Sequence, residues 1–182
     1  MWLYIIIGIV ILLLLLTFLI YNSLIRLDNK VEEAFSTMDV YLKKRWDLIP
    51  NLVETVKGYA KHEKDTLTSV IELRNRNYDT LNTNEKLNVN NKISEEISKI
   101  MIISENYPEI KASENFRNLS KQLTSVEEDI ANSRKYYNAT VRMFNNKVEM
   151  FPSNLVAKIF GYKTKNMFEI SNQERNNVKI EL

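Results

Sequence analysis

The sequence predicts an all-α protein in which an N-terminal transmembrane helix leads into a long antiparallel three-helix bundle with a short C-terminal helix. Three observations support this fold class. The first 22 residues carry no charged side chain, apolar residues then recur at spacings of three and four, and the 182 residues include only three glycines and three prolines. So few turn residues argue against all-β sandwiches and barrels, which need many tight turns.

An apolar segment over residues 3–20 is long enough to cross a lipid bilayer. Its 18 residues are aliphatic or Phe apart from Tyr4, Gly8 and Thr17, and about 20 such residues span the hydrocarbon core. A cleaved signal peptide would carry basic residues before the segment, a shorter apolar core and a small-residue cleavage site. None of these is present, so we expect an uncleaved transmembrane anchor over residues 1–22.

Basic residues flank this anchor on one side only. No Lys or Arg precedes the anchor, whereas Arg26 and Lys30 follow it. Lys and Arg accumulate in the cytoplasmic segments next to membrane spans. The asymmetry therefore predicts an outside N-terminus and a cytoplasmic C-terminal part.

The first helix beyond the anchor is predicted from an apolar stripe. The stripe starts at Leu24, repeats every three or four residues, and continues to about residue 76. Pro50 lies inside the stripe without changing its phase, so we expect a kinked but continuous helix. Gly58 lowers helix stability and suggests a close approach of another backbone.

The second helix is predicted between two breaks in the pattern. Residues 75–84 are rich in Asn and Thr and lose the apolar periodicity, so they form the first connection. Apolar residues then mark a helix over residues 84–106. This helix ends at Tyr107, because a residue before proline disfavours the helical conformation.

The third helix spans residues 113–150, which contain no Gly or Pro. Ser113 is its expected N-cap, and Glu114 places an acidic side chain at the positive end of the helix. Residues 151–154 then form a turn. A short helix over residues 155–160 follows and is closed by Gly161.

These elements define an anchor over residues 1–22, a helical bundle over residues 23–162 and a C-terminal tail over residues 163–182. Outside the membrane, the first helix would extend about 76 Å and the second only about 33 Å. A short second helix cannot cover a long first one. Either the third helix covers the membrane-proximal stretch, or part of the first stripe is free for a partner.

Composition and motifs argue against catalysis. The chain has no cysteine, which excludes a disulfide framework, a thiolate zinc site, an iron–sulfur cluster and a cysteine nucleophile. The single histidine, His62, lacks a second histidine one turn away that would place two metal ligands on one helix face. No Gly-rich phosphate loop occurs, and a net charge of +2 gives no reason to expect nucleic acid. We expect no enzyme activity, cofactor, metal or small-molecule substrate.

Most charged clusters are interpreted as solvated helix faces. The adjacent carboxylates of Glu127 and Glu128 point to different sides of a helix. The basic residues 43–45 would lie about 30 Å from the membrane on an upright helix, which is well beyond a Debye length. We therefore do not expect these basic residues to bind lipid headgroups.

A set of polar residues on the long helices is the candidate interaction site. Arg45 and Glu54 flank the expected kink at Pro50 and could contact polar residues of the third helix. Two interpretations stay open: a buried polar network that fixes the register of the helices, which we favour, and a surface that docks a partner. The set comprises Arg45, Asp47, Asn51, Glu54, Asn115, Arg134 and Asn138.

Several motifs resemble the LemA protein family of bacteria. They are YLKKRWDLIPNLVETVKGYAKHE at 41–63, ENYPEIKASENF at 105–116, RKYYN at 134–138, FPSNLVA at 151–157, FGY at 160–162 and FE at 168–169. The resemblance extends from residue 1 to about residue 169, and only residues 176–180 depart from the more acidic, proline-containing ending of the family.

The resemblance implies a short outer N-terminus, one span of the bacterial inner membrane and a cytoplasmic antiparallel helical bundle. It implies no reaction. Relatives are linked loosely to membrane proteases, to envelope stress and, in magnetosome-forming bacteria, to organelle membranes.

Two functions from different classes remain. The first is a membrane-anchored scaffold or adaptor whose bundle presents a helical groove to another membrane protein, such as a membrane protease or an envelope-stress component. The second is a structural protein that organises the membrane by homo-oligomerisation, with the stripe from Leu24 to Trp46 as the contact between copies. Both functions make the lipid bilayer a partner.

Overall fold

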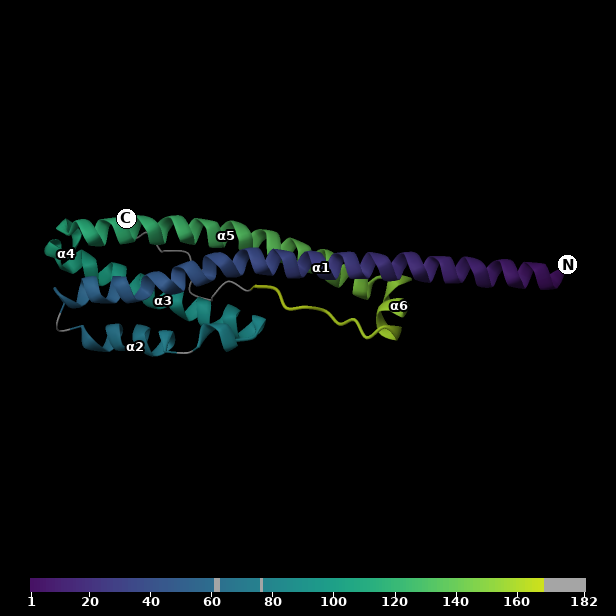
Figure 1. Cartoon of the computed structure of the whole chain (residues 1–182), viewed down its shortest axis with the longest axis horizontal. Coiled ribbons are helices and arrows are strands. Elements are labelled where there is room, and N and C mark those ends of the chain that lie inside the picture. The colour runs from purple at the N-terminus through teal and green to yellow at the C-terminus, as the bar shows by residue number, and fades with distance from the viewer. Residues whose placement is uncertain (61–62, 76, 169–182) are drawn as a thin grey trace, which may run out of the picture. The chain divides into compact units, whose positions relative to one another are not determined.

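The structure is a computed structural model that describes residues 1–60, 63–75 and 77–168; the side chains of residues 64 and 65 are left out of the description. Most of the described residues are helical, with no β-strand among them, which confirms the all-α class (Figure 1). Their elements are α1 (Trp2–Lys57), α2 (Lys64–Arg74), a 3-10 turn η1 (Tyr78–Thr80), α3 (Thr83–Asn106), α4 (Pro108–Ala112), α5 (Glu114–Glu149) and α6 (Ser153–Ile159).

The chain divides into two compact units. Among the described residues, unit 1 comprises Met1–Thr37 and Ser133–Met167, and unit 2 comprises Met38–Asn132 and Phe168. The two long helices α1 and α5 therefore contribute residues to both units, while α6 belongs to unit 1 and α2, α3 and α4 belong to unit 2.

Helix α1 continues through Pro50 but ends at Lys57, so the predicted single helix to residue 76 is wrong. The backbone N–H groups of Tyr59 and Ala60 both donate to the Val56 carbonyl, which satisfies an acceptor at the helix end. Gly58 explains the position of the break, because a helix-interior glycine costs about 1 kcal/mol relative to alanine. The apolar stripe continues beyond the break because α2 is itself amphipathic and buries Leu67 and Val70.

The boundaries of the second and third helices agree with the sequence prediction to within about two residues. Asn82 begins α3 with a reciprocal capping box, in which its side chain accepts from the Glu85 N–H and the Glu85 side chain accepts from the Asn82 N–H. The predicted cap Ser113 accepts from the Phe116 N–H at 3.5 Å. The short helix α4 was not predicted, and it begins with Pro108 at a first-turn position where proline is tolerated.

Unit 1 has an apolar core where α1, α5 and α6 meet. Leu24, Val156 and Ala157 are buried together, with partly buried side chains around them from α1, from α5 and from Tyr162, which follows α6. Gly161, at a φ of 76°, closes α6 as predicted, and the N–H of Tyr162 donates to the Ala157 carbonyl across this end.

A segment without helix, residues 162–167, follows α6 and is fixed to unit 1. The Asn145 side chain donates to the Lys165 carbonyl at 2.9 Å and accepts from the Lys165 N–H at 2.8 Å. The Tyr137 hydroxyl donates to the Asn166 carbonyl, and the Lys165 ammonium pairs with Asp28. The first residues of the predicted tail are therefore held by specific hydrogen bonds, whereas residues 169–182 lie outside the described part of the chain.

Unit 2 buries apolar side chains of α1, α2, α3 and α5. Helices α2 and α3 lie side by side, and α3 also contacts α4 (Figure 1). The buried residues recur at spacings of three and four on each helix, as the stripe predicted. They include Leu42, Trp46, Ile49 and Leu52 of α1, Ile93 and Ile100 of α3, and Leu123, Val126 and Ile130 of α5.

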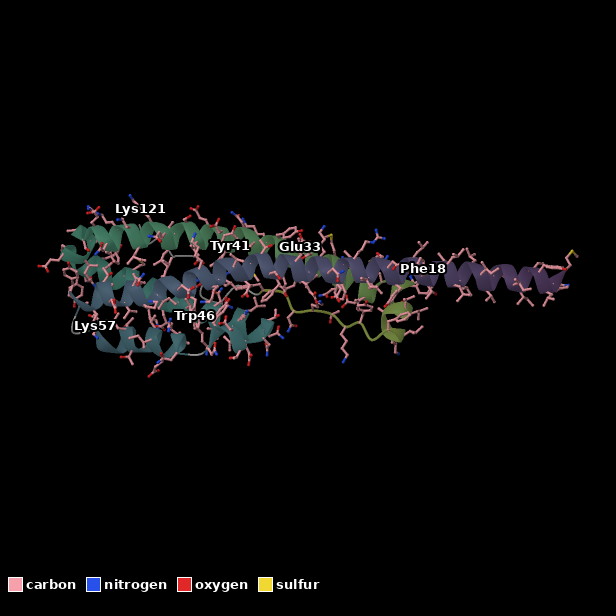
Figure 2. The ribbon with its side chains drawn as sticks, in the orientation of Figure 1. Phe18, Glu33, Tyr41, Trp46, Lys57 and Lys121 are labelled. Carbon is pink, nitrogen blue, oxygen red and sulfur yellow. The ribbon has the colours of Figure 1, made fainter. Side chains whose placement is uncertain are left out.

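The apolar side chains in the N-terminal part of α1 are exposed. Large apolar side chains from Trp2 to Leu19 are each 44% to 79% exposed, and Phe18 projects into open space (Figure 2). By length and composition, α1 is the one helix in the described residues that could cross a membrane, and its apolar window is not buried within the structure. This arrangement is compatible with a membrane anchor.

Candidate functional site

The most unusual side chain in unit 2 is a buried arginine. Arg45 of α1 is only 1% exposed. One of its guanidinium nitrogens, Nη1, donates to the Ser94 hydroxyl at 2.8 Å and to the Glu127 carboxylate. The other, Nη2, donates to the Asn90 backbone carbonyl at 3.0 Å and to the Asn90 side-chain oxygen. A single α1 side chain thus connects α3 and α5.

The phase of the apolar stripe explains why Arg45 is buried. It lies three residues after Leu42 and four before Ile49, and side chains at these spacings share one helix face. Asn90 occupies the same kind of position on α3, between Leu87 and Ile93. Burying an ion is costly unless hydrogen bonds satisfy it, and the partners from α3 and α5 meet that requirement.

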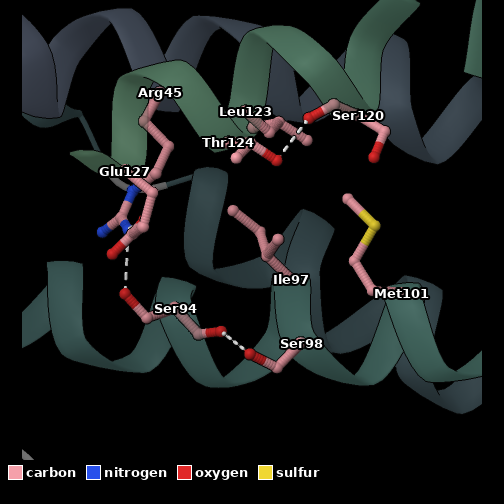
Figure 3. Close-up of a pocket in the computed structure, with 9 residues that line it drawn as sticks. All are labelled: Arg45, Ser94, Ile97, Ser98, Met101, Ser120, Leu123, Thr124 and Glu127. Carbon is pink, nitrogen blue, oxygen red and sulfur yellow. Dashed lines mark hydrogen bonds and ion pairs between the residues drawn. The ribbon is translucent and has the colours of Figure 1, made fainter. Parts of the chain in front are cut away.

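A groove of about 430 Å³ lies between α3 and α5 beside this arginine (Figure 3). Its apolar surface comes from Ile97, Met101 and Leu123. Hydroxyl groups from both helices border that surface, and Arg45 and Glu127 lie at one end of the groove. The bordering hydroxyls are those of Ser94, Ser98, Ser120 and Thr124.

The hydroxyls give the groove an acceptor character. Ser98 donates its proton to the Ser94 carbonyl at 2.9 Å, and Thr124 donates to the Ser120 carbonyl at 3.0 Å. A hydroxyl has one proton and two lone pairs, so oxygens whose protons are engaged within their own helix remain acceptors. The Glu127 carboxylate, which is 46% exposed, adds a negative group at the end of the groove. The groove therefore suits a ligand that carries hydrogen-bond donors.

A second polar cluster in unit 2 fixes the connection between α2 and α3 to α1. The Tyr78 hydroxyl and the Lys86 ammonium each donate to the Asp39 carboxylate at 2.6 Å. The Tyr78 ring packs against Trp46, with centroids 5.1 Å apart. Burial, and then the hydrogen bond to the negative Asp39, raises the pKa of the Tyr78 hydroxyl well above its usual value of 10.0.

A sequence model of the LemA family matches residues 34–182, which is most of the chain. The chain belongs to the LemA family. This result agrees with the resemblance seen in the sequence motifs.

The individual relatives are of two kinds, a protein named LemA and proteins named for the magnetosome. The chain is similar to "Protein LemA" of Metamycoplasma hominis, with 26% identity over 159 residues that make up 86% of this chain and 72% of the relative. It is also similar to "Magnetosome protein MamQ 1" and "Magnetosome protein MamQ 2" of Paramagnetospirillum magneticum. Each is 21% identical over 175 residues, and these matches cover 82% of this chain but only 64% of the relative. Both kinds of relative indicate a membrane-associated protein of the LemA family.

Of the polar residues that the sequence singled out in this LemA-family chain, Arg45 alone lines the groove. Asp47 is exposed and accepts a hydrogen bond from Lys43 at 2.6 Å. Asn51 is also exposed, and its backbone carbonyl accepts from the Thr55 hydroxyl. Glu54 is exposed and borders another hollow, of about 340 Å³, between α1 and α2.

The remaining predicted residues lie on α5. Asn115 is exposed in its first turn, in unit 2, whereas Arg134 and Asn138 are partly buried and belong to unit 1. Within unit 2, Arg45 is buried, whereas Asp47, Asn51, Glu54 and Asn115 are exposed. His62, the single histidine, lies outside the described residues.

Sequence reasoning missed the partners that Arg45 has in unit 2. Asn90 and Ser94 were not singled out. Glu127 was interpreted with Glu128 as part of a solvated face, and its pairing with Arg45 was not foreseen, although its side chain is 46% exposed. The basic residues 43–45 are likewise not one surface cluster, because Arg45 points into the core. The available signal was the phase of Asn90 within the apolar stripe of α3, since a polar residue at a core position requires a partner.

Proposed function

We propose that this protein is a membrane-anchored, non-catalytic helical adaptor that binds a segment of another membrane protein in the groove between α3 and α5. In this proposal α1 crosses the bilayer once, with the N-terminus outside, and the rest of the chain forms a cytoplasmic antiparallel three-helix bundle. The bias of Arg26 and Lys30 to one side of the apolar segment supports the orientation.

The groove is the observation that carries the adaptor function. Small serine and threonine side chains on both borders allow the backbone of a docked helix to approach closely. Acceptor hydroxyls and Glu127 favour a partner helix with basic or amide side chains on one face, and Ile97 and Leu123 supply apolar contact.

The homo-oligomer alternative requires a different surface from the one predicted. Leu24, Val31, Met38, Leu42 and Trp46 are each no more than 3% exposed within a single chain. A contact between copies would therefore have to use another part of the molecule. The second candidate function is a role in organising membranes, and the similarity to magnetosome proteins supports it.

Site-specific photo-crosslinking in native membranes tests the adaptor proposal. A crosslinking residue at Thr124, inside the groove, should capture a membrane protein, whereas the same residue at the neighbouring Ser125, which is exposed but does not line the groove, should not. Filling the groove with Ser98→Trp should abolish that crosslink without changing the unfolding midpoint; Lys99→Trp is the matched control.

Three results would contradict the proposal. Equal capture from both positions would show that the groove is not the contact. Capture of a second copy of this chain from Thr124 would favour homo-oligomerisation. Full-length protein that emerges alone and monomeric from mild detergent, without any crosslink, would exclude both functions.

A further inference from the structure

Helix α6 packs on α1 at the point where the apolar segment ends. Leu24 is completely buried against Val156 and Ala157, and Ile20 and Tyr21 pack against the same cluster. The ring centroids of Tyr21 and Phe160 are 4.4 Å apart. Four residues separate Ile20 from Leu24, a rise of about 6 Å along a helix. The headgroup region on each side of a bilayer has a similar thickness, so α6 lies at the depth of this region if residues 3–20 span the hydrocarbon core.

The surface that α1 leaves uncovered on α6 and on the residues at its two ends is apolar and exposed. Five large apolar side chains within residues 150–160 are at least half exposed: Met150, Phe151, Leu155, Ile159 and Phe160. We call them the α6 apolar face. Beyond Leu19, the described residues contain eleven exposed large apolar side chains, and these five are the ones that gather in one short segment. An exposed apolar cluster of this kind marks a binding surface for a protein or a membrane.

The geometry within unit 1 favours a membrane over a protein. The buried positions 153, 156 and 157 face α1, whereas Leu155 and Ile159, one turn apart, lie on another side together. Helix α6 runs across the direction of α1 rather than along it (Figure 1). If α1 spans the bilayer, a helix that runs across α1 at the end of the apolar segment lies close to the membrane plane. The exposed Lys158 is typical of the polar part of interfacial helices.

We propose that the α6 apolar face is a second membrane contact, in which Phe151, Leu155, Ile159 and Phe160 insert into the headgroup boundary of the leaflet from which α1 emerges. The occupant of this surface is the lipid bilayer, because the face is continuous with the bare apolar surface of α1 through Ile20 and Tyr21. The contact fixes the depth and the rotation of unit 1 at the membrane. It rests on the proposed anchoring by α1.

Spin labels on the full-length protein test this contact. The chain has no cysteine, so Ile159→Cys and Leu155→Cys each introduce a unique site for a nitroxide. The protein is reconstituted in vesicles of phosphatidylcholine and phosphatidylglycerol, and collisions with oxygen and with a water-soluble nickel complex are measured. Ile102→Cys on α3, at 63% exposure, is the matched control, and Leu12→Cys reports on the anchor itself.

We expect labels at positions 155 and 159 to collide several-fold less with the nickel complex, and several-fold more with oxygen, than the label at position 102. Position 12 should behave like deep lipid. If positions 155 and 159 match position 102 while position 12 is in lipid, the second contact is wrong and the anchor stands. If position 12 is also in water, the anchoring itself fails. Immobile labels at 155 and 159 that are shielded from both reagents would show that a protein covers the face, which also overturns the proposal.

Discussion

The helices α1 and α5 contribute to both units, but they enclose different chemistry in each. In unit 1 they meet around apolar side chains such as Leu24 and Val156, and the hydrogen bonds of Asn145 lie beside this core, on the backbone of residues 162–167. In unit 2, Arg45 of α1 buries its guanidinium among groups from α3 and α5.

This difference shows which interactions determine the register of the long helices in each unit. Apolar side chains tolerate small shifts along a stripe, because one methyl group can replace another in a contact. A buried guanidinium tolerates no such shift, since leaving a buried charged group unsatisfied is strongly destabilising. Unit 2 therefore defines its register with a side chain inside the core, whereas unit 1 defines it with hydrogen bonds from Asn145 and Tyr137 to a backbone segment.

The largest expected effect comes from removing the buried charge. Arg45→Met keeps much of the apolar stem but leaves the Asn90 oxygen, in a residue only 3% exposed, without its guanidinium donor. We expect a loss of about 3 kcal/mol in the free energy of unfolding. Trp46 fluorescence in detergent, with Trp2→Phe so that unit 2 alone reports, measures this loss.

Lys44→Met is the matched control for Arg45→Met, because Lys44 is the exposed neighbour. Its effect should stay within about 0.5 kcal/mol. Equal stability of the two variants would contradict the proposed difference between the units, because the buried polar network would then not stabilise unit 2.

A smaller and more local effect is expected in unit 1. Asn145→Ala removes both hydrogen bonds to the Lys165 backbone, and each such bond contributes about 1 kcal/mol. Amide exchange at residues 163–167 should accelerate by about tenfold or more, while exchange in α3 stays unchanged. Asn146→Ala, at an exposed position next to it, should leave both rates unaltered. Faster amide exchange throughout the protein would show that the segment of residues 162–167 stabilises unit 2 as well as unit 1.

The smallest effect concerns Tyr78, and it depends on pH. Tyr78→Phe removes the hydrogen bond to Asp39, which Lys86 still neutralises, so we expect a loss of about 1 kcal/mol at neutral pH. The raised pKa of Tyr78 means that the native protein keeps the hydroxyl proton at pH values where the unfolded chain has lost it. This contribution to stability is complete below about pH 10 and declines as the pH rises above that value.

The stability difference between wild type and Tyr78→Phe should therefore shrink above about pH 10. Thermal unfolding followed by circular dichroism across this range measures the difference. Tyr136→Phe, which changes an exposed tyrosine, should show no such trend. A difference that stays constant with pH would mean that burial does not perturb the Tyr78 hydroxyl.

Sequence reasoning predicted the helices better than the site. The bounds of α3 and α5 follow from local signals, namely the apolar period and the residues that cap or end a helix. The groove needed information that no local signal carries, because Ser94, Ser120 and Glu127 become neighbours only when α3 and α5 pair in one particular register. Arg45 was singled out, but its partners in unit 2 were not.

The sequence by itself determined the all-α class, the exposed apolar segment and the closure of α6 at Gly161. Each depends on the conformational preferences of residues within a few positions of one another. Only the tertiary structure decided that Arg45 reaches Asn90, Ser94 and Glu127, and that α6 packs at the end of the apolar segment. The physical reason is that an apolar stripe specifies which face of a helix is buried, whereas the identity of the neighbour depends on how far each helix is displaced along the others.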